Sequence, residues 1–276
     1  MTPAIVGVDF TSAPRRAKPI TVARGRLRGA TLDVACVDRI VDWAGFVALL
    51  REPGPWVGGF DFPFGLPREL VRDLGWPGRW DALVRHYAAL DRAAVERAFA
   101  AWRAPRPAGS KFAHRACDAH SRAHPSMKLV NPPVAWMLHE GAPRLLAAGV
   151  HMPAVHDGDR SRVALEAYPG LLVRRIGEHA GRRIVSYKSD AAARSTPERR
   201  QARRRIVEAL ERGAHDLGIA VALDPALRRA ALADASGDTL DAIACAVQAA
   251  WGALRAGANY GLPARAADAE GWIVTA

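Results

Sequence analysis

The sequence predicts an α/β fold built on one mixed sheet, in which three antiparallel strands are followed by parallel strands, with helices on both faces and a helical insertion. Three observations predict it. Three apolar, β-branched segments come first, a short helical segment then leads to a fourth apolar segment, and long helical patterns alternate with a further strand in the second half. The 276 residues fit one large domain. We expect a single domain over 1–276, with the helical insertion at about 72–159.

The first half of the chain predicts the antiparallel part of the sheet. The first strand is expected over Ala4–Phe10, where AIVGVDF is apolar and β-branched. PITVARGRLR and TLDVACVDRI follow as two more strands with glycines at the turn, which makes an antiparallel meander. Asp42–Leu50 predicts a short helix that ends at EPGP. Trp56–Asp61 is then a fourth strand, and the helical crossover makes it parallel to the first.

The second half predicts the insertion and the rest of the sheet. RWDALVRHYAALDRAAVERAFAAW has helical periodicity, and a basic loop rich in His and Pro follows it. We expect this region to cover one edge of the sheet. Arg162–Gly170 predicts a fifth strand, with Pro169 starting the next helix. Thr196 and Pro197 begin another helix. SGDTLDAIACAVQAAWGALRAG has the best helical pattern in the chain, and EGWIVTA suggests a short last strand.

Charge and cysteine content limit the partners and the compartment. The formal net charge of +11 favours a polyanionic partner such as nucleic acid. Alternatively, the positive charge has no functional meaning. The chain has many arginines but only four lysines, and a compositional bias of the coding DNA could produce that by itself. Three widely separated cysteines are typical of a reducing cytoplasm. The N-terminus has no secretory pattern, and no apolar stretch approaches the roughly 20 residues of a membrane span, so we expect a cytoplasmic protein without a membrane partner.

Acidic residues stand where the predicted strands end. Asp61 interrupts the apolar run VGGFDFPFGLPRE, and a lone carboxylate in such a setting is costly unless something pairs with it. Asp9 ends the first strand, Glu166 lies in the fifth, and Asp238 and Asp241 share one face at the start of the late helix. Because the carboxyl ends of neighbouring parallel strands lie together and a helix start can face them, we expect these acids to converge.

Converging carboxylates predict a site for Mg²⁺ or Mn²⁺, which prefer hard oxygen ligands. Two such ions about 4 Å apart can activate a water and stabilise a leaving oxygen in phosphodiester cleavage. We predict Asp9, Asp61 and Asp241 as metal ligands and catalytic residues, Glu166 as a further ligand or water-orienting base, and Asp238 as a metal ligand or auxiliary acid. The alternatives are hydrogen bonds to backbone N–H groups for Asp9 and Asp61, an arginine partner for Glu166, and a favourable helix N-terminus for Asp238.

Basic residues in two loops are candidates for binding phosphate. The loop inside the insertion supplies Lys111, His114 and Arg115, and the segment YKSDAAAR supplies Lys188 and Arg194. Loops can lean over the carboxyl edge of a sheet, and arginine forks match phosphate oxygens. The outer arginines of TPERRQARRR fit a solvated helix face instead.

Several motifs together resemble a known family. GVDF, GFDFPFGLP, LEAYPG, YKSD and GDTLDAIACA…EGWI, in this order, resemble the domain of unknown function 429 family. The order of strands, with acids on the first and fourth, is similar to the ribonuclease H-like fold. The family is generally described as predicted nucleases of that fold, so the resemblance implies a nuclease, with Asp241 matching the final metal ligand and Asp238 the auxiliary one. It covers both ends of the chain and less of the region around 72–159.

The leading hypothesis is a metal-dependent nuclease or phosphodiesterase acting on DNA or RNA. The first alternative is a phosphotransferase of the actin-like or sugar-kinase type, because GVDFTSAPRR is similar to a phosphate loop. That class needs two repeated halves, and one half is evident here. The second alternative is a module that binds nucleic acid without catalysis and keeps the acids for structural reasons.

Overall fold

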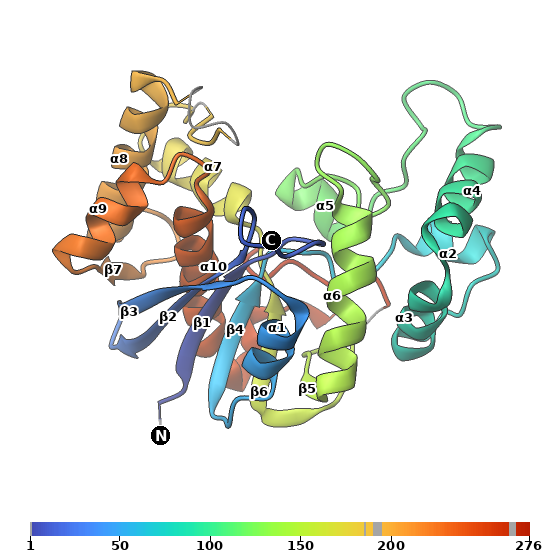
Figure 1. The fold of residues 1–276 in the computed structure, drawn as a ribbon, viewed down its shortest axis with the longest axis horizontal. Coiled ribbons are helices and arrows are strands. Elements are labelled where there is room, and N and C mark those ends of the chain that lie inside the picture. The colour runs from blue at the N-terminus through green and yellow to red at the C-terminus, as the bar shows by residue number, and fades with distance from the viewer. Residues whose placement is uncertain (1, 185, 190–194, 265–268) are drawn as a thin grey trace.

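A computed structural model describes residues 2–184, 186–189, 195–264 and 269–276. Its centre is a seven-stranded mixed sheet within these residues, in the order β5-β6-β4-β1-β2-β3-β7. β1 to β3 pair antiparallel, and the other neighbours pair parallel (Figure 1). The fold is the mixed α/β arrangement that the sequence predicts, and it is consistent with a ribonuclease H-like sheet. The strands are β1 (Ala4–Asp9), β2 (Ile20–Arg28), β3 (Thr31–Ile40), β4 (Trp56–Phe60), β5 (Val150–His151), β6 (Asp159–Glu166) and β7 (Ala220–Ala222).

The two central strands end side by side. β1 and β4 are parallel, with Ala4 opposite Trp56 and Val8 opposite Phe60. The ladder extends one residue further, because the backbone N–H of Asp61 donates to the carbonyl of Val8 at 2.9 Å. The predicted parallel pairing is confirmed, and it brings the residues that follow both strands to one edge of the sheet.

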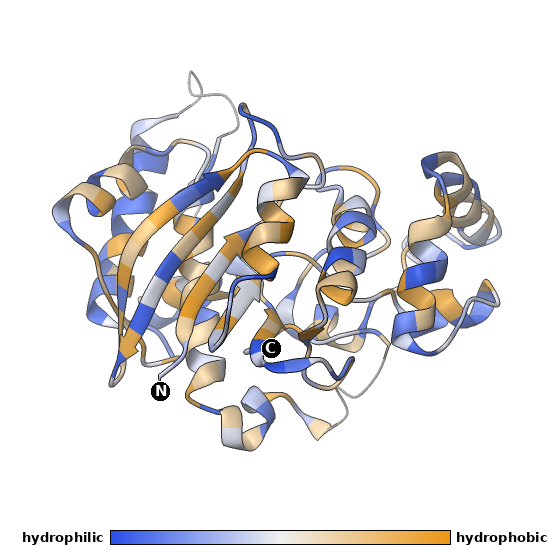
Figure 2. Ribbon diagram, turned by 60° about the horizontal axis from the view of Figure 1, so that its bottom comes forward, coloured by the Kyte–Doolittle hydropathy of each residue, from blue (hydrophilic) through white to orange (hydrophobic). Residues whose placement is uncertain are grey.

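Helices cover both faces of the sheet. Side chains alternate between the faces along each strand, so Ile5 packs in one core and Val6 and Val8 pack in the other. Figure 2 shows hydrophobic stretches along the strands, interrupted by hydrophilic residues. α1 lies in front of the sheet and α10 behind it in Figure 1. One face carries α1 (Trp43–Leu50) and α6 (Val134–Ala148), and the other carries α7 (Pro169–His179), α8 (Pro197–Arg212), α9 (Pro225–Ala233) and α10 (Asp238–Ala253).

Two glycines let α10 lie directly on the central strands. A Cβ atom at Gly7 would lie 2.0 Å from the carbonyl oxygen of Ala242, and one at Gly59 would lie 2.4 Å from that of Cys245. Any other residue at either position would therefore push the helix backbone away from the sheet. This close contact carries the first turn of α10 over the carboxyl ends of β1 and β4, where Asp241 meets the strand-end acids.

The chain between β4 and β6 is mainly helical, and all of it is described. It forms α2 (Arg68–Asp73), α3 (Trp80–Ala89), α4 (Arg92–Arg103), α5 (Ala116–Ser121) and α6. The structure differs from the sequence analysis at β5, a two-residue edge strand parallel to β6 within the region expected to be helical or irregular. Gly149 ends α6 with a φ of 67°, which turns the chain back along the sheet. The limits of about 72–159 for the insertion remain a prediction.

Other differences concern short elements. β6 ends at Glu166 rather than Gly170, because Tyr168 and Pro169 already begin α7. β7 was not predicted, since three residues carry too little periodicity to be read as a strand. α9 was not predicted either, although Asp224 and Pro225 carry the signal of a helix start. EGWIVTA makes one isolated bridge, between Ile273 and Glu166, in place of a strand. Within the described part of the chain, no helix is both long and apolar enough to cross a bilayer.

Candidate metal centre

Three carboxylates meet at the carboxyl edge of the central strands. Asp9 ends β1, Asp61 follows β4, and Asp241 lies in the first turn of α10. Each offers one oxygen, and the three oxygens all lie within 4.8 Å of one another. Asp241 is buried, while Asp9 and Asp61 are half-buried. Three carboxylate oxygens at this spacing suit a hard divalent cation such as Mg²⁺ or Mn²⁺.

The acids of this cluster repel one another. Burial raises the pKa of Asp9 well above its usual range, and the charges of Asp241, Asp238 and Asp61 raise it further. Burial and Asp241 also raise the pKa of Asp61, to about 7. Removing a carboxylate from water disfavours its charged form, and a neighbouring negative charge adds to that effect. A bound cation would reverse both effects, since an opposite charge favours the ionised form.

Lys188 and Tyr187, which both precede α8, form hydrogen bonds with Asp241. The Lys188 ammonium and the Tyr187 hydroxyl donate to different oxygens of the Asp241 carboxylate. Burial disfavours the charge on Lys188, but Asp241 and the neighbouring groups outweigh it, so the pKa of Lys188 lies well above its usual value. Its side chain is still 44% exposed. Lys188 is therefore a charged, partly solvated partner of Asp241.

Gly237 and Asp234 shape the start of α10. Gly237 has a φ of 81°, and a Cβ there would lie 2.9 Å from Cγ of Lys188 and 3.2 Å from the Tyr187 ring. The Asp234 carboxylate accepts hydrogen bonds from Thr239 N at 2.8 Å and Thr239 Oγ1 at 2.7 Å. Sequence reasoning missed Asp234, although an Asp shortly before a helix is a common capping signal. These residues orient Asp241 without belonging to the cluster.

Asp238 lies beside the cluster rather than within it. Its carboxylate is not among the three that approach within 4.8 Å, but its charge raises the pKa of Asp9. Burial raises the pKa of Asp238 itself, and Lys18 acts in the opposite direction. The structure thus places Asp238 as a half-buried neighbour, and its role as auxiliary ligand remains a prediction.

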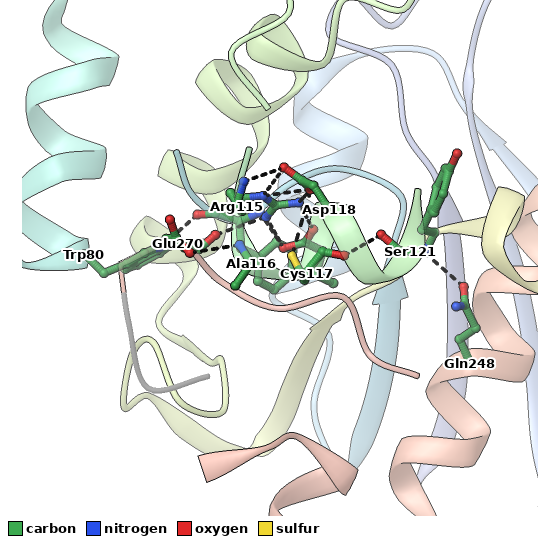
Figure 3. Close-up of polar contacts among 11 residues, drawn as sticks. Trp80, Arg115, Ala116, Cys117, Asp118, Ser121, Gln248 and Glu270 are labelled. Carbon is green, nitrogen blue, oxygen red and sulfur yellow. Dashed lines mark hydrogen bonds and ion pairs between the residues drawn. The ribbon is translucent and has the colours of Figure 1, made fainter. Parts of the chain in front are cut away.

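Glu166 and Arg115 form a separate, internally paired network. The Arg115 guanidinium donates to the two Glu166 oxygens at 2.7 and 2.8 Å and to Asp118 at 2.9 Å. Phe64 N–H also donates to Glu166, at 2.9 Å. In Figure 3 Arg115 lies between Asp118 and Glu270, whose backbone carbonyl accepts from the same guanidinium at 3.0 Å.

This network corrects two expectations. Both the Arg115 and the Glu166 side chains are only 2% exposed. Arg115 is not free to bind phosphate, because its donors are already committed to buried acceptors. Glu166 shows the arginine pairing that the sequence analysis left open as an alternative, and it is not part of the three-carboxylate cluster. It still lies close enough to raise the pKa of Asp61.

The remaining predicted phosphate contacts lie apart from the carboxylates or outside the described residues. Lys111 donates to the carbonyls of Arg103 at 2.9 Å and Ala104 at 3.3 Å, and so caps the end of α4. His114 is exposed, and neither it nor Lys111 lines the cavity that contains Asp61. Arg194 lies outside the described residues. Among the predicted cations, Lys188 alone is brought to the three carboxylates within the described chain.

A cavity of about 330 Å³ opens beside the cluster. Asp61 and Lys188 line one part of it, and the Arg115–Glu166 pair lines another. The rest of its wall is mainly apolar and aromatic. Its size is that of a small-molecule site, with few polar groups in an apolar surround. The apolar and aromatic lining residues include Phe62, Pro63, Val134, Met137, Tyr168 and Ile273.

Comparison with known proteins identifies the family to which the chain belongs. A family model described as "Protein of unknown function (DUF429)" matches residues 7–267. No curated protein matches the chain, and no solved structure matches it. The match spans the sheet, the insertion and α10, so the cluster of Asp9, Asp61 and Asp241 lies inside the matched region.

Proposed function

We propose that this chain, which belongs to the DUF429 family of proteins of unknown function, is a divalent-metal-dependent nuclease that hydrolyses phosphodiester bonds of nucleic acid. The observation that carries the proposal is the convergence of Asp9, Asp61 and Asp241 within 4.8 Å. A cavity beside them and a net charge of +11 support a substrate that is both small in cross-section and anionic.

Each residue of the site has a distinct task in this proposal. Asp9, Asp61 and Asp241 hold Mg²⁺ or Mn²⁺. Bound there, such ions lower the pKa of a water and stabilise negative charge on the leaving oxygen. Tyr187 keeps one Asp241 oxygen in place through its hydroxyl. Lys188, whose side chain is 44% exposed, leaves Asp241 when a cation binds and then neutralises a phosphate oxygen of the substrate.

The site has a physical reason to bind a cation. Asp9 and Asp61 have raised pKa values because burial and like charges oppose their ionisation. The single ammonium of Lys188 offsets only part of this repulsion. A divalent ion held by three oxygens supplies the missing positive charge, and its binding energy stabilises the folded state that presents those oxygens.

The location we infer for this activity is the cytoplasm. Cys36, Cys117 and Cys245 are all free thiols. A chain with three unpaired cysteines is typical of a reducing compartment, where nucleic acid is also present.

The deciding experiment measures metal binding and cleavage separately. Thermal melting with and without Mn²⁺ compares the wild type, Asp9→Asn and the control Asp157→Asn. The Asp157 side chain is 83% exposed, and the residue precedes β6, at the edge of the sheet opposite to the cluster. We expect Mn²⁺ to raise the melting temperature of the wild type and the control but not of Asp9→Asn, because a ligand stabilises the state that binds it. Labelled single- and double-stranded DNA and RNA should be cleaved by the same two proteins and not by Asp9→Asn.

The outcomes separate the competing functions. If Mn²⁺ shifts no protein, the acids are not a metal site and the non-catalytic module is favoured. If the wild type binds Mn²⁺, cleaves no polymer and hydrolyses ATP, the phosphotransferase is favoured. Cleavage by the wild type that survives in Asp9→Asn would contradict the proposed mechanism.

A further inference from the structure

A second, strongly basic groove adjoins the cavity beside the carboxylates. Its volume is about 820 Å³, and Arg122, Arg174, Arg182 and Arg183 line it. Glu178 is the one acid among its described lining residues. Like the cavity, this groove is lined by Gly170 and Tyr187. The two hollows therefore form one surface that runs from the carboxylate cluster to the arginines.

The four arginines of this groove come from three parts of the chain, and three of them are exposed. Arg122 ends α5, Arg174 lies on α7, and Arg182 and Arg183 follow α7. Arg174 is half-buried and donates to the carbonyl of Ser121 at 2.6 Å. Arg122, Arg182 and Arg183 are exposed, and their guanidinium groups have no ion pair with another described residue. Guanidinium forks with open donors match phosphate oxygens.

The cavity has the opposite character. Apart from its acid and cation groups, its wall consists of side chains such as Phe62, Met137 and Tyr168. A volume of about 330 Å³ suits a small ring system and excludes a base pair with its flanking stack. Aromatic side chains bind nucleobases in a sequence-tolerant way, because every base has a π-face.

We propose that this site takes a single nucleic-acid strand, with one unpaired base in the cavity next to Asp61 and the adjoining phosphates along the arginine groove. The inference rests on the proposed function for the reaction, but the binding it describes needs no metal. In this arrangement the cavity binds the base, and the arginine groove binds the phosphate backbone.

The first experiment measures binding in EDTA, where no cleavage occurs. Fluorescence anisotropy of a labelled single strand compares the wild type with Arg182→Ala/Arg183→Ala. The matched control is Arg85→Ala/Arg97→Ala, which makes the same charge change on α3 and α4, at the far end of the molecule from α7 (Figure 1). For single strands, log K falls with log [salt] by about 0.7 per phosphate contact. We expect the groove variant to reduce this slope by about 1.4 and the control to leave it unchanged.

The second experiment tests the base in the cavity. Met137→Trp fills the cavity, and Met137→Leu is the conservative control. An oligonucleotide with abasic sites, which lacks bases and keeps its phosphates, should bind the wild type about 5- to 150-fold more weakly than the normal strand, the range for stacking one base. Met137→Trp should lose this preference, and Met137→Leu should keep it. Because the abasic strand is compared on the unaltered wild type, the result does not depend on how a variant folds.

Three results would overturn this inference. The first is that a duplex binds as tightly as the single strand. The second is that Arg182→Ala/Arg183→Ala shows the same salt dependence of binding as its control. The third is that the wild type binds normal and abasic strands equally. A protein that cleaves duplex in Mn²⁺ and shows any of these keeps the proposed function and loses the single-strand inference. A protein that passes the binding tests and never cleaves keeps the inference and loses the proposed function.

Discussion

Two groups of acids, one buried and one partly buried, lie near the same edge of the sheet, and they are compensated differently. In the first, Glu166 and Asp118 share the guanidinium of Arg115, with every close contact between 2.7 and 3.4 Å. In the second, Asp9, Asp61 and Asp241 face one another, and one partly exposed lysine offsets them.

The difference indicates that the first group has a structural role and that the second is the candidate functional site. Arg115 satisfies its acids with fixed, buried hydrogen bonds, so that network ties α5, β6 and the C-terminal segment together and is complete without a ligand. The three aspartates are incomplete, since the pKa of Asp9 and that of Asp61 are raised by burial and mutual repulsion. A buried acid group that the protein itself does not neutralise is the better candidate for a functional site.

The largest effect is expected from breaking the complete network. Arg115→Ala leaves Glu166 and Asp118 buried without their cation, and breaking a buried pair in this way costs about 3–5 kcal/mol. Urea unfolding measures the loss. The control Arg175→Ala removes a more exposed pair with Asp216 and should cost about 0–1 kcal/mol. Equal losses in the two variants would mean that the Arg115 network is not a structural element.

A pH series on the incomplete cluster is expected to give the next largest effect. The pKa of Asp61 is about 7 in the folded protein and about 4 in an unfolded chain. The folded state thus binds the proton more tightly, and between about pH 4 and pH 7 the Asp61 contribution to stability falls as the pH rises.

Asp61→Asn tests this sign directly. Without divalent metal, the melting temperature of the variant should decline less between pH 4 and pH 7 than that of the wild type, because asparagine does not ionise. Mn²⁺ should remove much of the decline in the wild type, since the ion favours the charged form. Parallel curves for the two proteins in EDTA would show that Asp61 is not strained by its neighbours.

Lys188→Met sharpens the contrast by removing the only described cation at the cluster. Without metal, Asp241 loses an ion pair that is partly exposed, so stability should fall by about 1 kcal/mol. The rise in melting temperature caused by Mn²⁺ should be larger than in the wild type, because no ammonium has to leave. Weaker stabilisation by Mn²⁺ in Lys188→Met would show that Lys188 supports the ion rather than competing with it.

The smallest effect is the difference between two glycine substitutions, one of them at the turn that brings Lys188 to Asp241. Gly237→Ala introduces a residue at a φ of 81° and a Cβ 2.9 Å from Cγ of Lys188. Gly149→Ala is the control, since its φ is 67° and a Cβ there would meet nothing within 4 Å. The left-handed conformation costs each variant about 1–2 kcal/mol. An extra loss in Gly237→Ala, read from chemical denaturation, isolates the contact with Lys188, and identical losses would show that the segment moves freely.

The elements with strong local patterns were predictable from the sequence. Alternating and β-branched segments indicated β1 to β4, and capping residues and periodicity indicated α8 and α10, because these signals depend only on neighbouring residues. Asp9, Asp61 and Asp241 were also predictable as a group, since each stands at the end of an element whose direction the crossover rules determine. Very short segments were not predictable, and β5 and β7 were missed for that reason.

By itself, then, the sequence determined the antiparallel pairing of β1 to β3, the parallel pairing of β1 with β4, and the three aspartates that end up together. The tertiary structure alone decided which acids are neutralised. Arg115 and Glu166 are 51 residues apart, and Tyr187 and Asp241 are 54 apart, so no local pattern reveals either contact. The strand pattern does not distinguish Gly7 and Gly59 from other strand residues, and only the packing of α10 against them requires glycine at both positions. Burial and pairing depend on which distant segments pack together, and that is why a carboxylate is structural at Glu166 and a metal-ligand candidate at Asp61.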